Sequence, residues 1–178
     1  MRQLLLLRHA KSSADDATIA DRDRPLNPRG RRSAVAMRNA MRDLGLTPDV
    51  VLVSTARRTM ETLEALEPWE DTPLVEPMDS LYLANPIQLT AALHGVAETV
   101  RSVLVIGHNP GLHDLALSLA GTRAMAGGGD NERALAAGFP TGALAEFVVA
   151  GSWWDLREGG GKLVRFLTPR MLPSAGKP

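Results

Sequence analysis

Three short apolar segments of the chain each end in side chains that can bind an anion. These polar ends lie at residues 8–9, 54–58 and 107–111, and together they carry three arginines and two histidines. Arginine forms paired hydrogen bonds with phosphate oxygens and stays charged at every working pH. A neutral histidine ring can attack phosphorus and carry the phosphoryl group covalently. If the three ends meet, they suit phosphoryl transfer, which depends mainly on positioning and charge stabilisation.

Each polar end also has a simpler interpretation when it is taken alone. Arg8 and His9 could form a surface turn with a single ion pair, and His108 could be a turn residue in a segment rich in glycine and proline. A shared site therefore depends on a fold that brings the three ends together.

The segments that precede the polar ends predict β-strands. Residues 4–7, 49–53 and 102–106 are apolar runs too short for a helix, which is typical of strands buried on both faces. Residues 144–150 and 162–167 are predicted to be two further strands.

Helices are predicted between these strands. Asn27 and Pro28 have the residue types of a helix cap and a first helical position, and Gly45 suits the position just after the last turn. Further helices are predicted at residues 55–66, 86–96 and 112–120. This alternation predicts an α/β fold with a mostly parallel sheet, whose ligand crevice lies beyond the carboxyl ends of the strands. The three polar ends would converge there.

The length and the glycine pattern define the expected domain organisation. A single domain over residues 1–172 accommodates the predicted elements, since 178 residues can bury a substantial core. Residues 122–138 contain three consecutive glycines and little periodicity, so they are predicted to form a flexible loop, with room for a short helix after Asp130. Residues 173–178 are predicted to be a disordered tail.

The composition argues against several classes of partner and location. Twenty basic and twenty acidic residues leave no net charge to attract nucleic acid or an anionic membrane. No apolar stretch approaches the length of a membrane span. Because Arg8 interrupts the N-terminal leucine run too early for a signal peptide, a cytoplasmic location is predicted.

The composition also restricts the chemistry of the site. The chain has no cysteine, which excludes disulfides, thiolate metal sites and a cysteine nucleophile. His94 and His113 fall on predicted helices without carboxylates at ligand spacing, so neither a metal site nor a cofactor is predicted.

Four segments resemble the signature blocks of the histidine phosphatase superfamily, also called the phosphoglycerate-mutase-like or RHG superfamily. These blocks are LRHAKS (7–12), DRPLNPRG (23–30), LVSTARRTMET (52–62) and VIGHNPGL (105–112). The small size, the Arg-His-Ala form of the first block, FPTGALA (139–145) and LVRFLTPRML (163–172) are most similar to the SixA-like phosphohistidine phosphatases. The resemblance implies a three-layer α/β/α fold of the phosphoglycerate-mutase type.

The resemblance also implies roles for individual residues. His9 would be the nucleophile that becomes phosphorylated, and Arg8 and Arg58 would bind the phosphoryl group. His108 would stabilise the transferring group, and Asn109 would contact the substrate beside it.

The choice of Arg58 over the adjacent Arg57 follows from the family pattern. That pattern is Ser-Pro-x-x-Arg-Ala-x-x-Thr, and Ser54 and Thr62 match its two ends. The arginine then falls on Arg58, and Arg57 is expected on the solvated face of the helix.

The general acid of the family has no clear counterpart here. Many family phosphatases have a glutamate between the second arginine and the second histidine, and the carboxylates in that region are Glu76 and Asp79. SixA-like members often lack this acid. Because imidazole leaves phosphorus more readily than an alkoxide does, the absence of an acid favours a phosphoramidate substrate.

The residues and the resemblance together predict a metal-independent phosphatase that works through phospho-His9. Its predicted partner is a phosphorylated protein carrying phosphohistidine, since the short chain between Arg58 and His108 leaves little material for a lid. One alternative is a phosphatase of a small phosphorylated metabolite or sugar phosphate. Another is a non-catalytic phosphate-binding interaction module.

Overall fold

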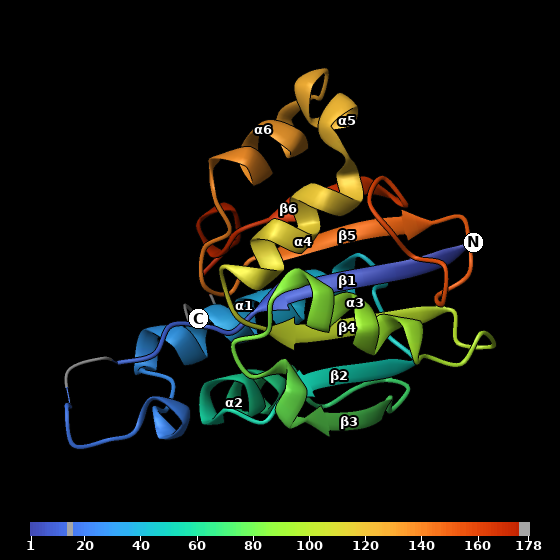
Figure 1. The fold of residues 1–178 in the computed structure, drawn as a ribbon. Coiled ribbons are helices and arrows are strands. Elements are labelled where there is room, and N and C mark those ends of the chain that lie inside the picture. Colours follow the sequence, from blue (N-terminus) through green and yellow to red (C-terminus); the bar gives the residue numbers. More distant parts are fainter. Residues whose placement is uncertain (14–15, 175–178) are drawn as a thin grey trace.

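The central element of the fold is a single β-sheet. The computed structural model describes residues 1–13 and 16–174, so residues 175–178 of the predicted tail lie outside the described residues. Within these residues, six strands pair in the order β3-β2-β4-β1-β5-β6 (Figure 1). The strands are β1 (Arg2–Arg8), β2 (Val50–Ser54), β3 (Leu74–Met78), β4 (Ser102–Gly107), β5 (Leu144–Val149) and β6 (Gly161–Leu167).

The strand directions confirm the prediction of a mostly parallel sheet. Strands β3, β2, β4 and β1 are parallel neighbours, whereas β5 is antiparallel to β1 and β6 is antiparallel to β5. In the register of β1 and β4, Arg8 lies opposite Gly107. In the register of β2 and β4, Val53 lies opposite Ile106. The three polar ends therefore meet at one edge of the sheet, on the left in Figure 1.

Helices cover both faces of the sheet and confirm the three-layer fold (Figure 1). Helices α1 (Pro28–Asp43) and α2 (Arg57–Leu66) lie on one face, and α3 (Pro86–His94) and α4 (Gly111–Ala120) lie on the other. The remaining helices are α5 (Thr122–Ala126), α6 (Asp130–Ala137) and the short 3₁₀ helices η1 (Asp21–Asp23), η2 (Asp79–Leu81) and η3 (Pro169–Met171).

Strand β1 is buried on both faces, as its leucine run predicts. Leu5 and Leu7 pack in the core beneath α1 and α2, whereas Leu4 and Leu6 pack in the core beneath α3 and α4. Each fully buried leucine contributes about 1.5–3 kcal/mol relative to an exposed one. Because both faces of β1 are buried, the strand has a fixed place in the sheet, and Arg8 at its end has a fixed place at the sheet edge.

Local capping explains where the helices begin. The Asn27 side chain accepts a hydrogen bond from the Gly30 amide at 2.7 Å, directly before Pro28 opens α1. Asn85 caps α3 in the same way, with reciprocal hydrogen bonds to Gln88. These contacts agree with the signals in the sequence.

The prediction of a loop over residues 122–138 was wrong, because most of this segment is helical. It forms α5 and α6, and the second of these is the short helix for which the sequence left room after Asp130. The Asn131 side chain donates one hydrogen bond to the backbone of β6 and accepts another from it, and Leu135 is fully buried. Contacts with a distant strand, which no local periodicity reveals, therefore hold this helix.

No helix in the described part of the chain combines the length and the apolar character that a membrane crossing requires.

Candidate active site

A cavity of about 430 Å³ opens at the carboxyl edge of the parallel strands. Five residues predicted from the sequence line it together: Arg8, His9, Arg58, His108 and Asn109. We call the three most deeply placed of these, His9, Arg58 and His108, the pocket floor; each is less than a tenth exposed.

The His9 ring has one defined tautomer. Its Nδ1 lies 2.7 Å from the carbonyl oxygen of Ala10. Since a carbonyl only accepts, Nδ1 carries the hydrogen and donates it, and Nε2 keeps its lone pair. Burial, together with the positive charges of Arg58 and Arg8, lowers the pKa of His9 to about 4. The hydrogen bond to Ala10 opposes this shift but is the weaker effect. The ring is therefore neutral near pH 7, and Nε2 is free to act as a nucleophile.

His108 is held between two partners on the pocket floor. Its Nε2 lies 2.8 Å from the hydroxyl of Ser54, and its Nδ1 lies 3.4 Å from a terminal nitrogen of Arg58. A guanidinium can only donate, so Nδ1 accepts and Nε2–H donates to Ser54. Burial first, and then the charge of Arg58, lowers the pKa of His108 to about 3. The centroids of the His9 and His108 rings are 5.4 Å apart.

Of the two adjacent arginines, Arg58 enters the pocket and Arg57 does not. The Arg58 side chain is 3% exposed. Both of its terminal nitrogens bond Asp21, at 2.7 Å to the carbonyl oxygen and at 3.1 Å to the carboxylate oxygen Oδ2. Arg57 lies at the surface and pairs with Glu61 at 3.5 Å.

Arg8 and Asn109 are anchored on the same carbonyl oxygen. Phe139 O accepts from Arg8 Nη1 at 3.0 Å and from Asn109 Nδ2 at 2.8 Å. Two other buried atoms, Arg8 Nε and Asn109 Oδ1, have no partner among the described residues. The Arg8 atom is a donor and suits a phosphoryl oxygen. The Asn109 atom is an acceptor and repels one, but the amide nitrogen of Asn109 has a second N–H that can donate to a substrate, so the substrate contact of Asn109 stays a prediction.

The first turn of α1 packs tightly against the chain that leaves His9. The Asn27 amide donates to the carbonyl oxygen of Lys11 at 3.0 Å. A Cβ atom on Gly30 would lie 2.0 Å from that same oxygen, so only glycine allows this approach. The DRPLNPRG block therefore packs against the segment that follows His9 and supports it.

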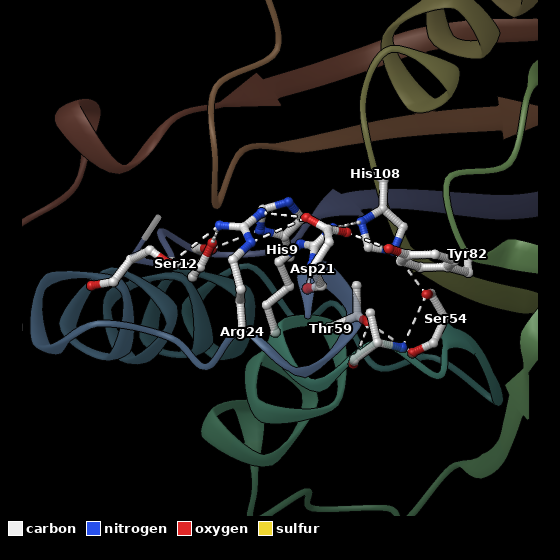
Figure 2. A network of polar contacts seen from close by, with 12 residues as sticks. His9, Ser12, Asp21, Arg24, Ser54, Thr59, Tyr82 and His108 are labelled. Atoms are coloured by element: carbon white, nitrogen blue, oxygen red, sulfur yellow. Dashed lines mark hydrogen bonds and ion pairs between the residues drawn. The ribbon is translucent and has the colours of Figure 1, made fainter. Parts of the chain in front are cut away.

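A polar cluster at the mouth of the pocket was missed by the sequence analysis. We call Asp21, Arg24 and Tyr82 the Asp21 cluster (Figure 2). Asp21 Oδ1 accepts from Arg24 Nε at 3.1 Å and from Arg24 Nη2 at 3.0 Å, while Oδ2 accepts from Arg58 and from the Tyr82 hydroxyl. The hydrogen bond from Tyr82 and those from the guanidinium groups lower the pKa of Asp21 to about 2. The sequence signal for this cluster was weak: Asp21 lies just before the DRPLNPRG block, and Arg24 lies within it.

Neither candidate for the general acid lies in the pocket, which corrects that part of the sequence prediction. Glu76 lies on β3 and lines a separate cavity between β2, β3 and α3. Asp79 is exposed and bonds Thr55 and Arg22, and the hydrogen bond from Thr55, together with Arg22, lowers the pKa of its carboxyl. Asp79 is therefore ionised near pH 7 and has no proton to give.

The pocket contains nitrogen donors and two neutral imidazoles. Arg8, Arg24 and Arg58 supply positive charge around the space in front of His9, which suits a dianionic phosphoryl group. Across residues 1–13 and 16–174, no group of three or more potential metal ligands is close enough to hold an ion.

Comparisons with known proteins agree with this geometry. Residues 4–78 match the family model of the histidine phosphatase superfamily (branch 1). The uncharacterized protein Rv1276c of Mycobacterium tuberculosis is 38% identical over 92% of this chain and 100% of its own length. A candidate phosphohistidine phosphatase SixA from Nakamurella multipartitia has a TM-score of 0.82 at 30% identity, over 94% of this chain and 96% of that one. The protein histidine phosphatase SixA complexed with tungstate has a TM-score of 0.74 at 25% identity, over 95% and 98% of the chains.

A mostly parallel sheet, covered by helices on both faces and carrying two arginines and two histidines at its carboxyl edge, defines a phosphatase of the phosphoglycerate-mutase-like class. The chain belongs to the histidine phosphatase superfamily and, within it, to the SixA-like branch.

Proposed function

We propose that this phosphatase removes phosphate from phosphohistidine on a protein, through a phosphorylated His9 intermediate. His9 is the nucleophile, Arg8 and Arg58 bind the phosphoryl oxygens, and His108 stabilises the transferring group. The observation that carries the proposal is the hydrogen bond from His9 Nδ1 to Ala10, because it places the hydrogen of the neutral ring on Nδ1 and leaves the lone pair on Nε2.

The reaction needs two displacements at phosphorus. The Nε2 lone pair of His9 forms a bond to phosphorus as the substrate's phosphorus–nitrogen bond breaks, and the electrons of the broken bond stay on the substrate nitrogen. His9 becomes a phosphorylated imidazolium whose Nδ1–H still faces Ala10. Water then attacks phosphorus, one proton is released, and inorganic phosphate leaves a neutral His9.

The carboxylates around the pocket support a phosphoramidate substrate. An alkoxide leaving group needs a proton donor, and Asp21, the carboxylate that lines the pocket, has a pKa of about 2. An imidazole that is already protonated leaves as a neutral molecule and needs no donor. The SixA names of the structural neighbours support the same class of substrate.

The intermediate can be tested with a generic aryl phosphate. We expect His9→Ala to lower the turnover rate by at least about a thousandfold and to abolish the acid-labile phosphoenzyme. His94→Gln is the matched control, because the His94 ring bonds the Leu156 carbonyl oxygen and does not line the pocket. EDTA should leave the rate unchanged. Full activity in the His9→Ala variant would contradict the proposal.

A small phosphorylated metabolite is the second candidate substrate, since a cavity of about 430 Å³ lies in the size range of small-ligand sites. Rates on a phosphorylated histidine-containing transfer protein and on a panel of phosphomonoesters separate the two. Faster turnover of any monoester would favour this second candidate.

A further inference from the structure

The Asp21 carboxylate lines the pocket on its solvent side, next to the floor residue Arg58. The Arg58 side chain on the pocket floor is 3% exposed, whereas the Asp21 side chain is 48% exposed. One terminal nitrogen of Arg58 lies 3.4 Å from His108 Nδ1 and 3.1 Å from Asp21 Oδ2. Asp21 therefore contacts the floor directly through Arg58, on the side that opens to solvent.

Binding of a phosphoryl group would free one position on this carboxylate. In the resting pocket each oxygen of Asp21 accepts two hydrogen bonds, so its four acceptor positions are filled. Arg58 is the donor that a phosphoryl group recruits. Once Arg58 turns to the phosphoryl oxygens, Oδ2 can accept a hydrogen bond from the substrate, while Arg24 and Tyr82 still hold the carboxylate in place.

The charge on Asp21 suits a cationic partner. The groups that face it are the guanidiniums of Arg24 and Arg58 and the hydroxyl of Tyr82, and with them its pKa is about 2. Near pH 7 the carboxylate can therefore accept a hydrogen bond from a protonated nitrogen, but it has no proton to donate.

We propose that Asp21 is the catalytic residue that selects phosphohistidine: its carboxylate accepts a hydrogen bond from the ring N–H of the substrate imidazolium. This inference rests on the proposed function and deepens it. The phosphorus–nitrogen bond breaks with its electron pair moving to the substrate nitrogen, and the ring departs as neutral imidazole with its other N–H unchanged. No proton is transferred, and the carboxylate keeps the substrate ring protonated while His9 attacks.

The test compares two substrates in the Asp21→Asn variant. Asparagine keeps the size and an acceptor oxygen for Arg24 but loses the charge. We expect kcat/KM for a phosphohistidine peptide to fall by about tenfold to a hundredfold, the usual cost of losing a hydrogen bond to a charged group. For p-nitrophenyl phosphate, whose phenolate needs no protonation, kcat/KM should fall much less, by about threefold, because Arg58 loses its charged partner but no contact to the leaving group is lost.

The matched control is Asp23→Asn in the same 3₁₀ helix. Asp23 is exposed and has no side-chain hydrogen bond or ion pair among the described residues. It should leave kcat/KM for both substrates unchanged. In wild type, activity on the peptide should persist to higher pH than in Asp21→Asn, because the carboxylate stabilises the protonated ring. If Asp21→Asn folds poorly, Asp21→Glu, which keeps the charge, should retain the preference for the peptide over the ester.

Three outcomes would overturn the inference. Equal losses on both substrates would mean that Asp21 only positions Arg58. Gains on both would mean that it only competes with the phosphoryl group for Arg58. Wild-type protein that turns over p-nitrophenyl phosphate but not the phosphohistidine peptide would overturn the proposed substrate as well, which distinguishes the two failures.

Discussion

The pocket floor and the Asp21 cluster are in direct contact, yet different kinds of structural element hold the two in place. The floor residues His9, Arg58 and His108 follow buried strands directly or within the first turn of the next helix, and the sheet brings them together. The Asp21 cluster comes from a 3₁₀ helix and loops at the surface. The Arg58–Asp21 ion pair joins the two regions, with 3% and 48% of the side chains exposed.

This difference indicates that the ion pair mainly positions the Arg58 side chain and adds little to the stability of the fold. An ion pair with one half-exposed partner is screened by water and contributes little to folding. It does, however, point both terminal nitrogens of Arg58 toward the pocket mouth. In the proposed mechanism the floor residues carry out the phosphoryl transfer, and the Asp21 cluster contacts the leaving group.

The largest expected effect separates a floor residue from its surface neighbour. Arg58→Gln should lower kcat/KM for an aryl phosphate by about a hundredfold to a thousandfold, because a buried charge that stabilises the transition state is lost. Arg57→Gln, on the exposed side of the same helix, should change it by less than about twofold. Steady-state kinetics check this pair, with the melting temperature as a folding control. Similar losses in both variants would contradict the distinction.

As the pH falls, the stability of the fold should decrease through the two histidines of the pocket floor before Asp21 becomes protonated. His9 and His108 have native pKa values of about 4 and about 3, below the ordinary 6.5, so the unfolded chain binds more protons as the pH falls below 6.5. Stability is therefore full above pH 6.5 and falls toward pH 4, by roughly 2 kcal/mol for each histidine between pH 6.5 and 5. Asp21 protonates only near pH 2.

Urea denaturation at pH 7 and pH 5 measures this effect on stability. The His9→Gln variant should show a smaller difference between the two pH values than wild type. A difference that is identical in both proteins would argue against the lowered pKa of His9.

The support behind the floor can be tested at Gly30. Gly30→Ala should destabilise the fold by about 1–3 kcal/mol and reduce turnover, because the new Cβ would displace the Lys11 carbonyl oxygen, 2.0 Å away, and with it the chain that leaves His9. Gly151→Ala is the control, since nothing lies within 4 Å of its Cβ position. Equal stability of the two variants in thermal melts would show that the Lys11 segment can yield without cost.

The smallest expected effects compare one hydroxyl from each region. Ser54→Ala removes the acceptor for the Nε2–H of buried His108 and should lower kcat/KM for the aryl phosphate by about tenfold. Tyr82→Phe removes one of several donors to Asp21 and should lower it by less than about threefold, because Arg24 still holds the carboxylate. A larger loss in Tyr82→Phe would reverse the ranking of floor over Asp21 cluster.

The elements predicted best from the sequence are those with both a strong local signal and two buried faces. The leucine run of β1 and the Asn-Pro starts of α1 and α3 lie where the sequence indicated. Strand β3 was not predicted. It lies at the sheet edge, is mostly exposed and contains Glu76 and Pro77, so it shows neither the continuous apolar run nor the alternation of a typical strand.

The same contrast applies to the residues of the pocket. Strand ends carry Arg8 and His108, and the rule that parallel strands share a carboxyl edge was enough to predict that they meet. No such rule applies to Asp21. Its 3₁₀ helix has no hydrophobic period, and its partners Arg58 and Tyr82 lie far away in the sequence. The positions of Glu76 and Asp79, both outside the pocket, were equally beyond local reasoning.

By itself, the sequence determined the buried strands, the helix starts and the polar ends that the sheet would collect, because hydrophobic periodicity and capping act over a few residues. Only the tertiary structure decided which carboxylate faces the pocket, which ring nitrogen of His9 is free and how the glycine-rich segment folds into α5 and α6. Those outcomes depend on hydrogen bonds and burial between segments far apart in the chain, and these contacts exist only once the whole sheet has formed.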